Sequence, residues 1–196
     1  MRAMRGCRRS TGRRVVTAAW RNRVIGLALA AAIFLLDQWI KALALGPWNL
    51  REVGVIDLLP FFDLRWTQNF GVSLGMFEAT SPEMRWALVA VTGLIAAVVF
   101  VWMQRERAMW DIAGLALILG GALGNIRDRY LYGYVIDYAD FHIGTWRPFL
   151  VFNVADAAIT IGVLIILARA LFMREKPPTA QGDDVADGTA EKSTNA

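Results

Sequence analysis

The stretch Gly120-Gly-Ala-Leu-Gly-Asn-Ile-Arg-Asp-Arg129 ends a long apolar segment in a cluster of polar side chains. The segment carries no charge from 112 to 124. Its last turns hold four polar residues: Asn125, Arg127, Asp128 and Arg129. Ionisable groups are costly inside a bilayer, and they are usually found there facing a partner or a water-filled cavity. This stretch therefore predicts a membrane-spanning helix and is the first candidate for a functional site.

The composition is that of an integral membrane protein. Of the 196 residues, 56% are hydrophobic, and the mean hydropathy is +0.40. The formal charge of +4 comes largely from a block of arginines between Arg2 and Arg23. Such a block could bind nucleic acid, but beside an apolar segment it favours a cytoplasmic anchor, so we expect no nucleic-acid partner. The single Cys7 excludes an internal disulfide and a cysteine-cluster metal site.

Four segments are long and apolar enough to cross a bilayer as helices. They comprise residues 24–45, 86–103, 109–131 and 149–168. The first could instead be a cleaved signal peptide, because it has a basic start and an Ala42-Leu43-Ala44 triplet. Asp37 and Lys41 lie before that triplet, however, and three more apolar segments follow. We therefore predict an all-α integral membrane protein that is a four-transmembrane-helix bundle.

The connections predict one further element and the domain limits. Within the long connection 46–83, residues 62–67 alternate apolar and polar side chains, as a half-buried strand does, so we expect a small extracytoplasmic β element. Ser81 and Pro82 have the order of a helix start, and 132–148 is expected to be a second outer loop. The predicted parts are a basic segment 1–23, a four-span domain 24–173 and a disordered tail 174–196.

The basic residues predict the orientation of the chain. The N-terminal arginines, the 104–107 connection and the basic residues around 169–176 all fall on one side of a four-span topology. Lys and Arg are enriched in cytoplasmic loops, so both termini should be cytoplasmic. The polar groups of the first, third and fourth spans then meet at one outer depth, as an active site or a transport gate requires.

Helical spacing groups these polar residues. Asp37 and Lys41 stand at i and i+4, where they can pair, either for stability alone or for function. Asn125, Asp128 and Arg129 share one surface of the third span, and Asn153 and Asp156 repeat the i, i+3 spacing on the fourth. Gly120 and Gly124 form a small-xxx-small pattern, which predicts close helix packing.

Asp137 and Asp156 are the candidate acid and base. No partner for Asp137 is apparent in its own loop. Two carboxylates in a partly desolvated site cannot both ionise cheaply, so one holds a proton and the other attracts one from water. Peptide hydrolysis needs such a pair, but a proton or cation path uses the same residue types. The pattern alone leaves both open.

Other chemistries find little support. His142 is the only histidine, too few for an ordinary zinc site, so no metal is expected. No Gly-x-Ser-x-Gly elbow is present, and a nucleophilic triad cannot easily be assembled from one histidine. No cofactor is expected either.

At these residues the chain resembles the lipoprotein signal peptidase family, signal peptidase II, over about residues 24–172. Five pieces match in order and spacing: Asp37-Gln-x-x-Lys41, Asn69-x-Gly71-x-Ser73, Gly124-Asn125-x-x-Asp128-Arg129, Gly133-x-Val135-x-Asp137 and Phe152-Asn153-x-Ala155-Asp156. The resemblance implies an aspartyl endopeptidase of the bacterial inner membrane. Such an enzyme removes signal peptides from prolipoproteins by cutting before the diacylglyceryl-modified cysteine.

The resemblance also implies roles for individual residues. Asp137 and Asp156 would be the catalytic dyad. Eight residues would bind the substrate or shape its site: Asp37, Lys41, Asn69, Gly71, Asn125, Asp128, Arg129 and Asn153. The expected partners are diacylglyceryl-modified prolipoproteins and membrane lipids, and we expect a monomer. The alternatives are a small proton-coupled transporter that uses the same carboxylates, or a non-catalytic membrane assembly factor.

Overall fold

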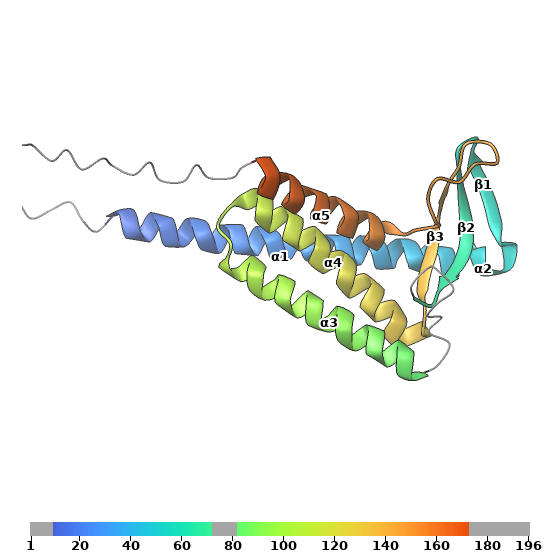
Figure 1. The fold of residues 1–196 in the computed structure, drawn as a ribbon, viewed down its shortest axis with the longest axis horizontal. Coiled ribbons are helices and arrows are strands. Elements are labelled where there is room, and N and C mark those ends of the chain that lie inside the picture. The colour runs from blue at the N-terminus through green and yellow to red at the C-terminus, as the bar shows by residue number, and fades with distance from the viewer. Residues whose placement is uncertain (1–9, 72–81, 173–196) are drawn as a thin grey trace, which may run out of the picture.

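Four long helices and a small sheet at one end of them make up the fold, seen in a computed structural model that describes residues 10–71 and 82–172 (Figure 1). The helices are α1 (Ser10–Leu45), α2 (Leu50–Val53), α3 (Pro82–Arg105), α4 (Met109–Tyr132) and α5 (Val154–Phe172). The strands are β1 (Val55–Leu59), β2 (Phe62–Asn69) and β3 (Val135–Phe141). The beginning of α1 and the end of α5 lie at the end of the bundle opposite the sheet.

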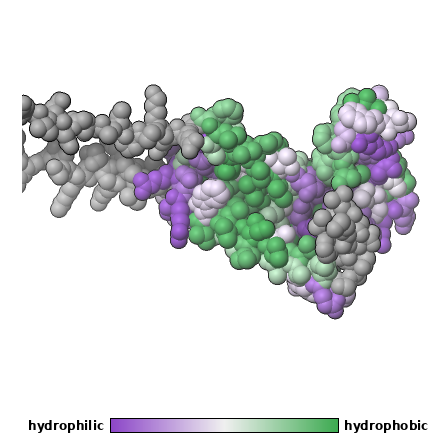
Figure 2. Space-filling view, in the orientation of Figure 1, coloured by the Kyte–Doolittle hydropathy of each residue, from purple (hydrophilic) through white to green (hydrophobic). Residues whose placement is uncertain are grey.

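Apolar side chains cover the outside of the helices (Figure 2). Four helical segments are long and apolar enough to cross a membrane: Trp20–Leu45, Pro82–Arg105, Met109–Tyr132 and Val154–Phe172. Leucines and valines of these segments are exposed, for example Leu94 at 68% and Leu164 at 56%. Such a surface suits lipid and not water, because soluble monomers rarely expose large contiguous apolar patches. The prediction of a four-span helical membrane protein is confirmed.

Glycines let α4 pack closely in the centre of the bundle. A Cβ at Gly120 would lie 2.5 Å from the Ala30 carbonyl oxygen of α1, and one at Gly121 would collide with Ala155 of α5. A Cβ at Gly124 would lie 2.5 Å from the carboxylate of Asp37. The predicted packing role of Gly120 and Gly124 is therefore confirmed. Larger residues here would push α1 and α5 away from α4.

The sheet is antiparallel, in the order β1-β2-β3, and it positions two predicted site residues. Asp137 stands opposite Thr67, and Asn69 stands opposite Val135. The predicted strand at 62–67 is the first part of β2, but β3 lies inside the predicted loop 132–148. It was missed because six of its seven residues are buried, so its sequence lacks the alternation of a half-buried strand. Its Ile136 packs with Leu50 and Leu64 in the core beneath the sheet.

The start of the fourth span was also predicted wrongly. Phe152 pairs with Ala139 of β3 through backbone hydrogen bonds of 2.8 and 3.0 Å, so the chain before it is extended. The helix therefore begins at Val154, five residues after the predicted start at 149. At the other end of the chain, the predicted limit between 23 and 24 lies inside α1. Ser81 and the predicted tail fall outside the described residues.

Candidate active site

The start of α5 fixes the carboxylate of Asp156. The Asn153 Oδ1 accepts a hydrogen bond of 2.9 Å from the Asp156 backbone N–H, and the Asp156 Oδ2 accepts one of 3.3 Å from the Asn153 N–H. This is a reciprocal cap of the capping-box kind, with Asn153 at the N-cap position and Asp156 three residues later. The Asn-x-x-Asp spacing in the sequence predicts such a cap, as well as placing both side chains on one helix face.

The same asparagine also holds Asp137. The Asn153 Nδ2 donates to the Asp137 Oδ1 at 2.6 Å, so both aspartates contact one side chain. Asn69 of β2 donates to the other Asp137 oxygen at 3.0 Å. Asn69 is oriented in turn by the Gly71 N–H, which donates to its Oδ1 at 3.1 Å. Gly71 has a φ of 133°, a conformation that favours glycine.

Asp137 lies in an environment that favours its protonated form. Its side chain is 2% exposed. Burial, followed by the negative charge of Asp156, raises the pKa of Asp137 from its usual value near 4 to about 7. The amide donors of Asn69 and Asn153 oppose this rise only in part. A carboxyl group with such a pKa can hold a proton near neutral pH and give it up to a substrate.

Asn125 connects Asp156 to a buried lysine. Its Nδ2 donates to the Asp156 Oδ1 at 2.8 Å, and its Oδ1 accepts from the Lys41 Nζ at 3.3 Å. The Asn153 Nδ2 lies 3.4 Å from the same Asn125 oxygen. The charge on Lys41 therefore fixes which end of the Asn125 amide faces Asp156, because an ammonium group can only donate.

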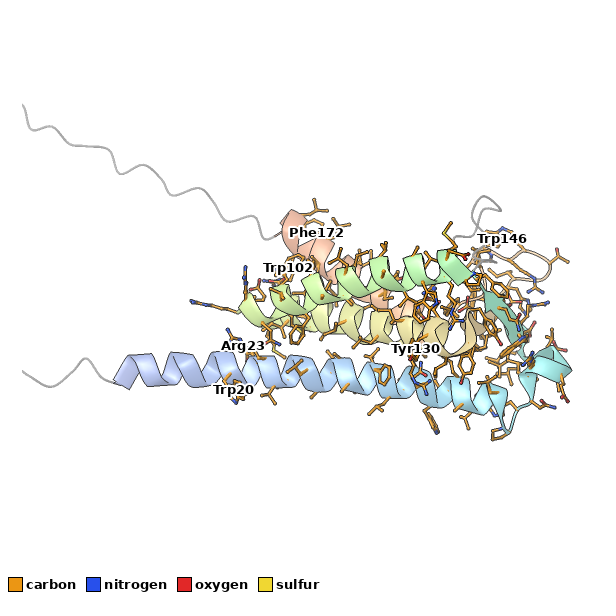
Figure 3. The ribbon with its side chains drawn as sticks, turned by 90° about the horizontal axis from the view of Figure 1, so that it is seen from below. Trp20, Arg23, Trp102, Tyr130, Trp146 and Phe172 are labelled. Carbon is orange, nitrogen blue, oxygen red and sulfur yellow. The ribbon has the colours of Figure 1, made fainter. Side chains whose placement is uncertain are left out.

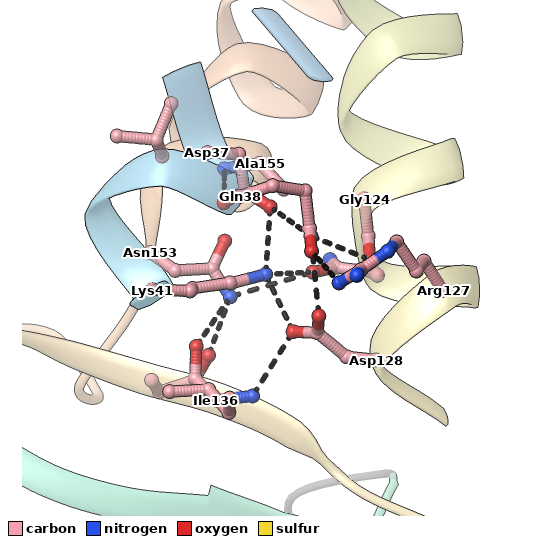
Figure 4. A network of polar contacts seen from close by, with 12 residues as sticks. Asp37, Gln38, Lys41, Gly124, Arg127, Asp128, Ile136, Asn153 and Ala155 are labelled. Carbon is pink, nitrogen blue, oxygen red and sulfur yellow. Dashed lines mark hydrogen bonds and ion pairs between the residues drawn. The ribbon is translucent and has the colours of Figure 1, made fainter. Parts of the chain in front are cut away.

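Lys41 stands between two buried carboxylates (Figure 4). Its Nζ lies 2.8 Å from the Asp37 Oδ2 and 2.7 Å from the Asp128 Oδ2, and all three side chains are 2% exposed or less. The Asp37 Oδ1 also accepts a 3.0 Å hydrogen bond from the Ala155 N–H, in the first turn of α5. The predicted pairing of Asp37 with Lys41 is confirmed. Asp128 belongs to this ion cluster, and its Oδ2 also accepts a 3.3 Å hydrogen bond from the Ile136 N–H, next to Asp137 in β3.

Gln38 belongs to the same network, although the sequence analysis gave it no role. Its Nε2 lies 3.0 Å from the Asp37 Oδ2 and 3.2 Å from the Asp128 Oδ1. Its Oε1 accepts a hydrogen bond from the guanidinium of Arg127. The signal that could have found it is its place between Asp37 and Lys41 in the matching motif.

Arg129 lies near the dyad without a fixed partner in the described residues. Its guanidinium interacts electrostatically with the negative charges of Asp156 and Asp137. Its buried Nε has no hydrogen-bond acceptor among residues 10–71 and 82–172. Its backbone oxygen accepts a 2.7 Å hydrogen bond from Arg85 of α3, which ties the end of α4 to α3. Arg129 is thus a cation available to a ligand beside the two aspartates.

A second acidic cluster lies on the sheet, close to basic side chains. Asp140 of β3, 1% exposed, accepts a 2.7 Å hydrogen bond from Arg65 and another from Arg147. The His142 Nε2 lies 2.9 Å from the Asp63 Oδ2. In the described part of the chain, no three His, Cys, Asp or Glu side chains are placed to bind a metal ion. These pairs connect β2 and β3 to the segment that follows the sheet.

Comparison with known proteins decides the family. The family model of Signal peptidase (SPase) II matches residues 29–172. The chain belongs to the signal peptidase II family. A lipoprotein signal peptidase of Rhizorhabdus wittichii is 55% identical over 163 residues, which cover 83% of this chain and 95% of that protein. One of Sphingopyxis alaskensis is 54% identical and covers 83% of this chain and 94% of its own length.

Solved structures share the fold. A bacterial membrane enzyme solved by the in meso method at 2.3 Å resolution matches with a TM-score of 0.65 and 24% identity. That match covers 78% of this chain and 93% of the other. A second such structure, at 1.9 Å, gives a TM-score of 0.63 and 25% identity. The transporter alternative is not supported.

Proposed function

We propose that this peptidase removes signal peptides from diacylglyceryl-modified prolipoproteins, with Asp137 and Asp156 as its catalytic dyad. The observation that carries the assignment is that Asn153 donates to both carboxylates, with its side-chain amide to Asp137 of β3 and with its backbone N–H to Asp156 of α5. The two aspartates are 19 positions apart in the sequence, yet they share one short polar network. Family membership supplies the substrate class, a lipid-modified precursor cut before its modified cysteine.

The surroundings of the two aspartates give them different roles. Asp156 accepts hydrogen bonds from Asn125 and from the Asn153 N–H at a helix N-terminus, an arrangement that stabilises negative charge. Asp137 is buried beside it and has a raised pKa. Asp156 is therefore the base, and Asp137 is the acid that carries the proton at rest.

The proposed reaction needs one water molecule and no covalent intermediate. Asp156 takes a proton from the water as its oxygen attacks the scissile carbonyl carbon, and Asp137 gives its proton to the carbonyl oxygen. Collapse of the tetrahedral intermediate breaks the C–N bond. The leaving nitrogen receives a proton from Asp156, and the hydroxyl that becomes the new carbonyl returns its proton to Asp137. Asn69, Asn125 and Asn153 hold the two carboxylates in place. Arg129 and Gly71 are positioned to contact the substrate backbone.

The architecture supports a matching placement in the membrane. The dyad lies at the end of the bundle that carries the sheet, and the chain enters and leaves the described bundle at the opposite end. With the basic segments on the cytoplasmic side, both termini would be cytoplasmic and the dyad would lie near the outer face. A precursor anchored by its lipid and its signal helix presents its cleavage point at that depth. The chain would then work as a monomer.

The direct test uses purified protein and two versions of one precursor. We expect the diacylglyceryl-modified precursor to be cut before its cysteine and the unmodified precursor to remain intact. A chelator such as EDTA should leave the rate unchanged, because the proposed chemistry uses only side chains. Equal cleavage of both precursors, or cleavage at another bond, would contradict the proposed substrate class.

The pH dependence of the cleavage rate tests whether Asp137 is the general acid. Below about pH 7 Asp137 keeps its proton, and above that pH it loses the proton that the acid must give. We therefore expect kcat/KM to fall roughly tenfold per pH unit above about pH 7, since the protonated fraction falls by that factor. Steady-state rates between pH 5 and 9 in one detergent check this. A rate that rises through pH 7 would reverse the proposed roles.

A further inference from the structure

α1 runs beside α3 and α4 (Figure 3), and an apolar hollow lined by these three helices lies along the bundle. Its volume is about 600 Å³, and its floor is formed by Leu119, Leu123 and Ile126 of α4. α1 and α3 touch each other at few points, so the hollow stays open between them. A Cβ at Gly93 of α3 would have no neighbour within 4 Å. No close helix contact therefore requires this glycine, and its missing side chain widens the hollow.

A polar pocket of about 320 Å³ continues this hollow toward the sheet. Gln38, Lys41, Arg127 and Tyr132 line it, together with the end of α1. Gln38 follows Phe34 of the hollow by one helical turn on α1. Arg127 follows Leu123 in the same way on α4. Since residues four apart lie on one helix face, the apolar hollow and the polar pocket form a single stripe.

Arg127 gives this pocket an available positive charge. Its side chain is exposed, and within residues 10–71 and 82–172 it forms no ion pair with a carboxylate. Its guanidinium donates instead to Gln38, which holds it at the mouth of the pocket. Lys41 contributes little to binding an anion, because Asp37 and Asp128 already neutralise it.

We infer that this stripe binds one anionic phospholipid, with its phosphate against Arg127 and one acyl chain in the hollow. A basic pocket between membrane helices, above an apolar groove, matches the two halves of such a lipid. A helix is the competing occupant. An apolar helix would offer no anion to the guanidinium of Arg127, so the positive charge favours the lipid.

This site is separate from the proposed catalytic dyad. Leu123 and Arg127 face the side of α4 next to α1 and α3, whereas Asn125 faces Asp156 of α5. Two residues link the regions: Gln38 contacts both Arg127 and the Asp37–Asp128 cluster, and Lys41 lines the pocket and contacts Asn125. The inference therefore does not depend on the proposed function.

The test measures lipid binding and not peptide cleavage. Protein stripped of lipid in detergent is mixed with phosphatidylglycerol or phosphatidylcholine, and bound lipids are counted by native mass spectrometry. We expect one tightly bound phosphatidylglycerol per chain and weaker binding of phosphatidylcholine. Arg127→Gln should weaken phosphatidylglycerol binding about tenfold or more, because a charge-assisted hydrogen bond is lost. Gly93→Leu, which fills the hollow, should weaken the binding of both lipids.

Two matched controls separate the site from the general surface. Arg51→Gln removes an exposed cation from α2, and Ala168→Leu adds the same leucine to the exposed surface of α5. Both should bind lipid like the unchanged protein, and all four variants should have similar melting temperatures. Unaltered binding in Arg127→Gln, or equal binding of the two lipids, would overturn the inference. Dimers that Gly93→Leu dissociates would also overturn it, by showing a second copy in the hollow.

Discussion

Asp137→Asn and Asp156→Asn are each expected to lower the cleavage of a diacylglyceryl-modified precursor by roughly 10³-fold or more, as loss of a general acid or base commonly does. An amide cannot take the proton from the attacking water, which disables Asp156→Asn. It also cannot give a carboxylic proton to the carbonyl oxygen, which disables Asp137→Asn. The rate is measured on purified protein by following the shortened precursor on a gel.

The matched control is Asp57→Asn. Asp57 is an exposed aspartate of β1 in the same small sheet, so the chemical change is identical and only the position differs. Its rate and melting temperature should equal those of the unchanged protein. Full cleavage by either dyad variant would refute the dyad. A non-catalytic assembly factor would tolerate both substitutions as long as the bundle folded.

The double variant Asp137→Asn/Asp156→Asn sharpens this test. Residues that act together in one step are strongly non-additive, and removing the second costs little once the first is gone. We therefore expect the double variant to be about as slow as the slower single variant. Two independent structural roles would instead give losses that multiply.

The long helices and one ion pair could be predicted because their signals are local. An uncharged run of eighteen residues predicts a span, and α3 covers the segment 86–103 predicted in this way. The i, i+4 spacing of Asp37 and Lys41 similarly predicts a pair that the structure contains. Such features depend only on neighbours within one or two turns of a helix.

The partners of Asp137 could not be predicted in this way. Asn69 lies 68 positions before it, and the two meet only because β2 pairs with β3 in one register. Asn153 reaches Asp137 only because the chain before α5 is extended against β3. A one-residue change of register would turn Asp137 to the other face of the sheet. These contacts are set by strand pairing, for which β3 offers no alternating pattern.

Lys41→Met is expected to destabilise the protein by about 3–5 kcal/mol, the usual cost of removing one partner from a buried ion pair. The substitution leaves Asp37 and Asp128, both fully buried, without the ammonium that lies 2.8 and 2.7 Å from them. The two carboxylates would then have to take up protons or draw in water. A large drop in the melting temperature of the purified protein should follow. Arg51→Met, which removes an exposed cation, should change it little.

Neutralising Asp37 and Asp128 as well shows whether their unpaired negative charge causes the loss of stability in Lys41→Met. The triple variant Lys41→Met/Asp37→Asn/Asp128→Asn has no buried charge at this place, so most of the lost stability should return. Its cleavage rate is the informative result. Lys41 also fixes the Asn125 amide that donates to Asp156, so a stable triple variant should still cleave slowly. A triple variant with full activity would show that Lys41 is not needed to orient Asn125. A Lys41→Met protein with an unchanged melting temperature would show that Asp37 and Asp128 do not need the ammonium group for stability.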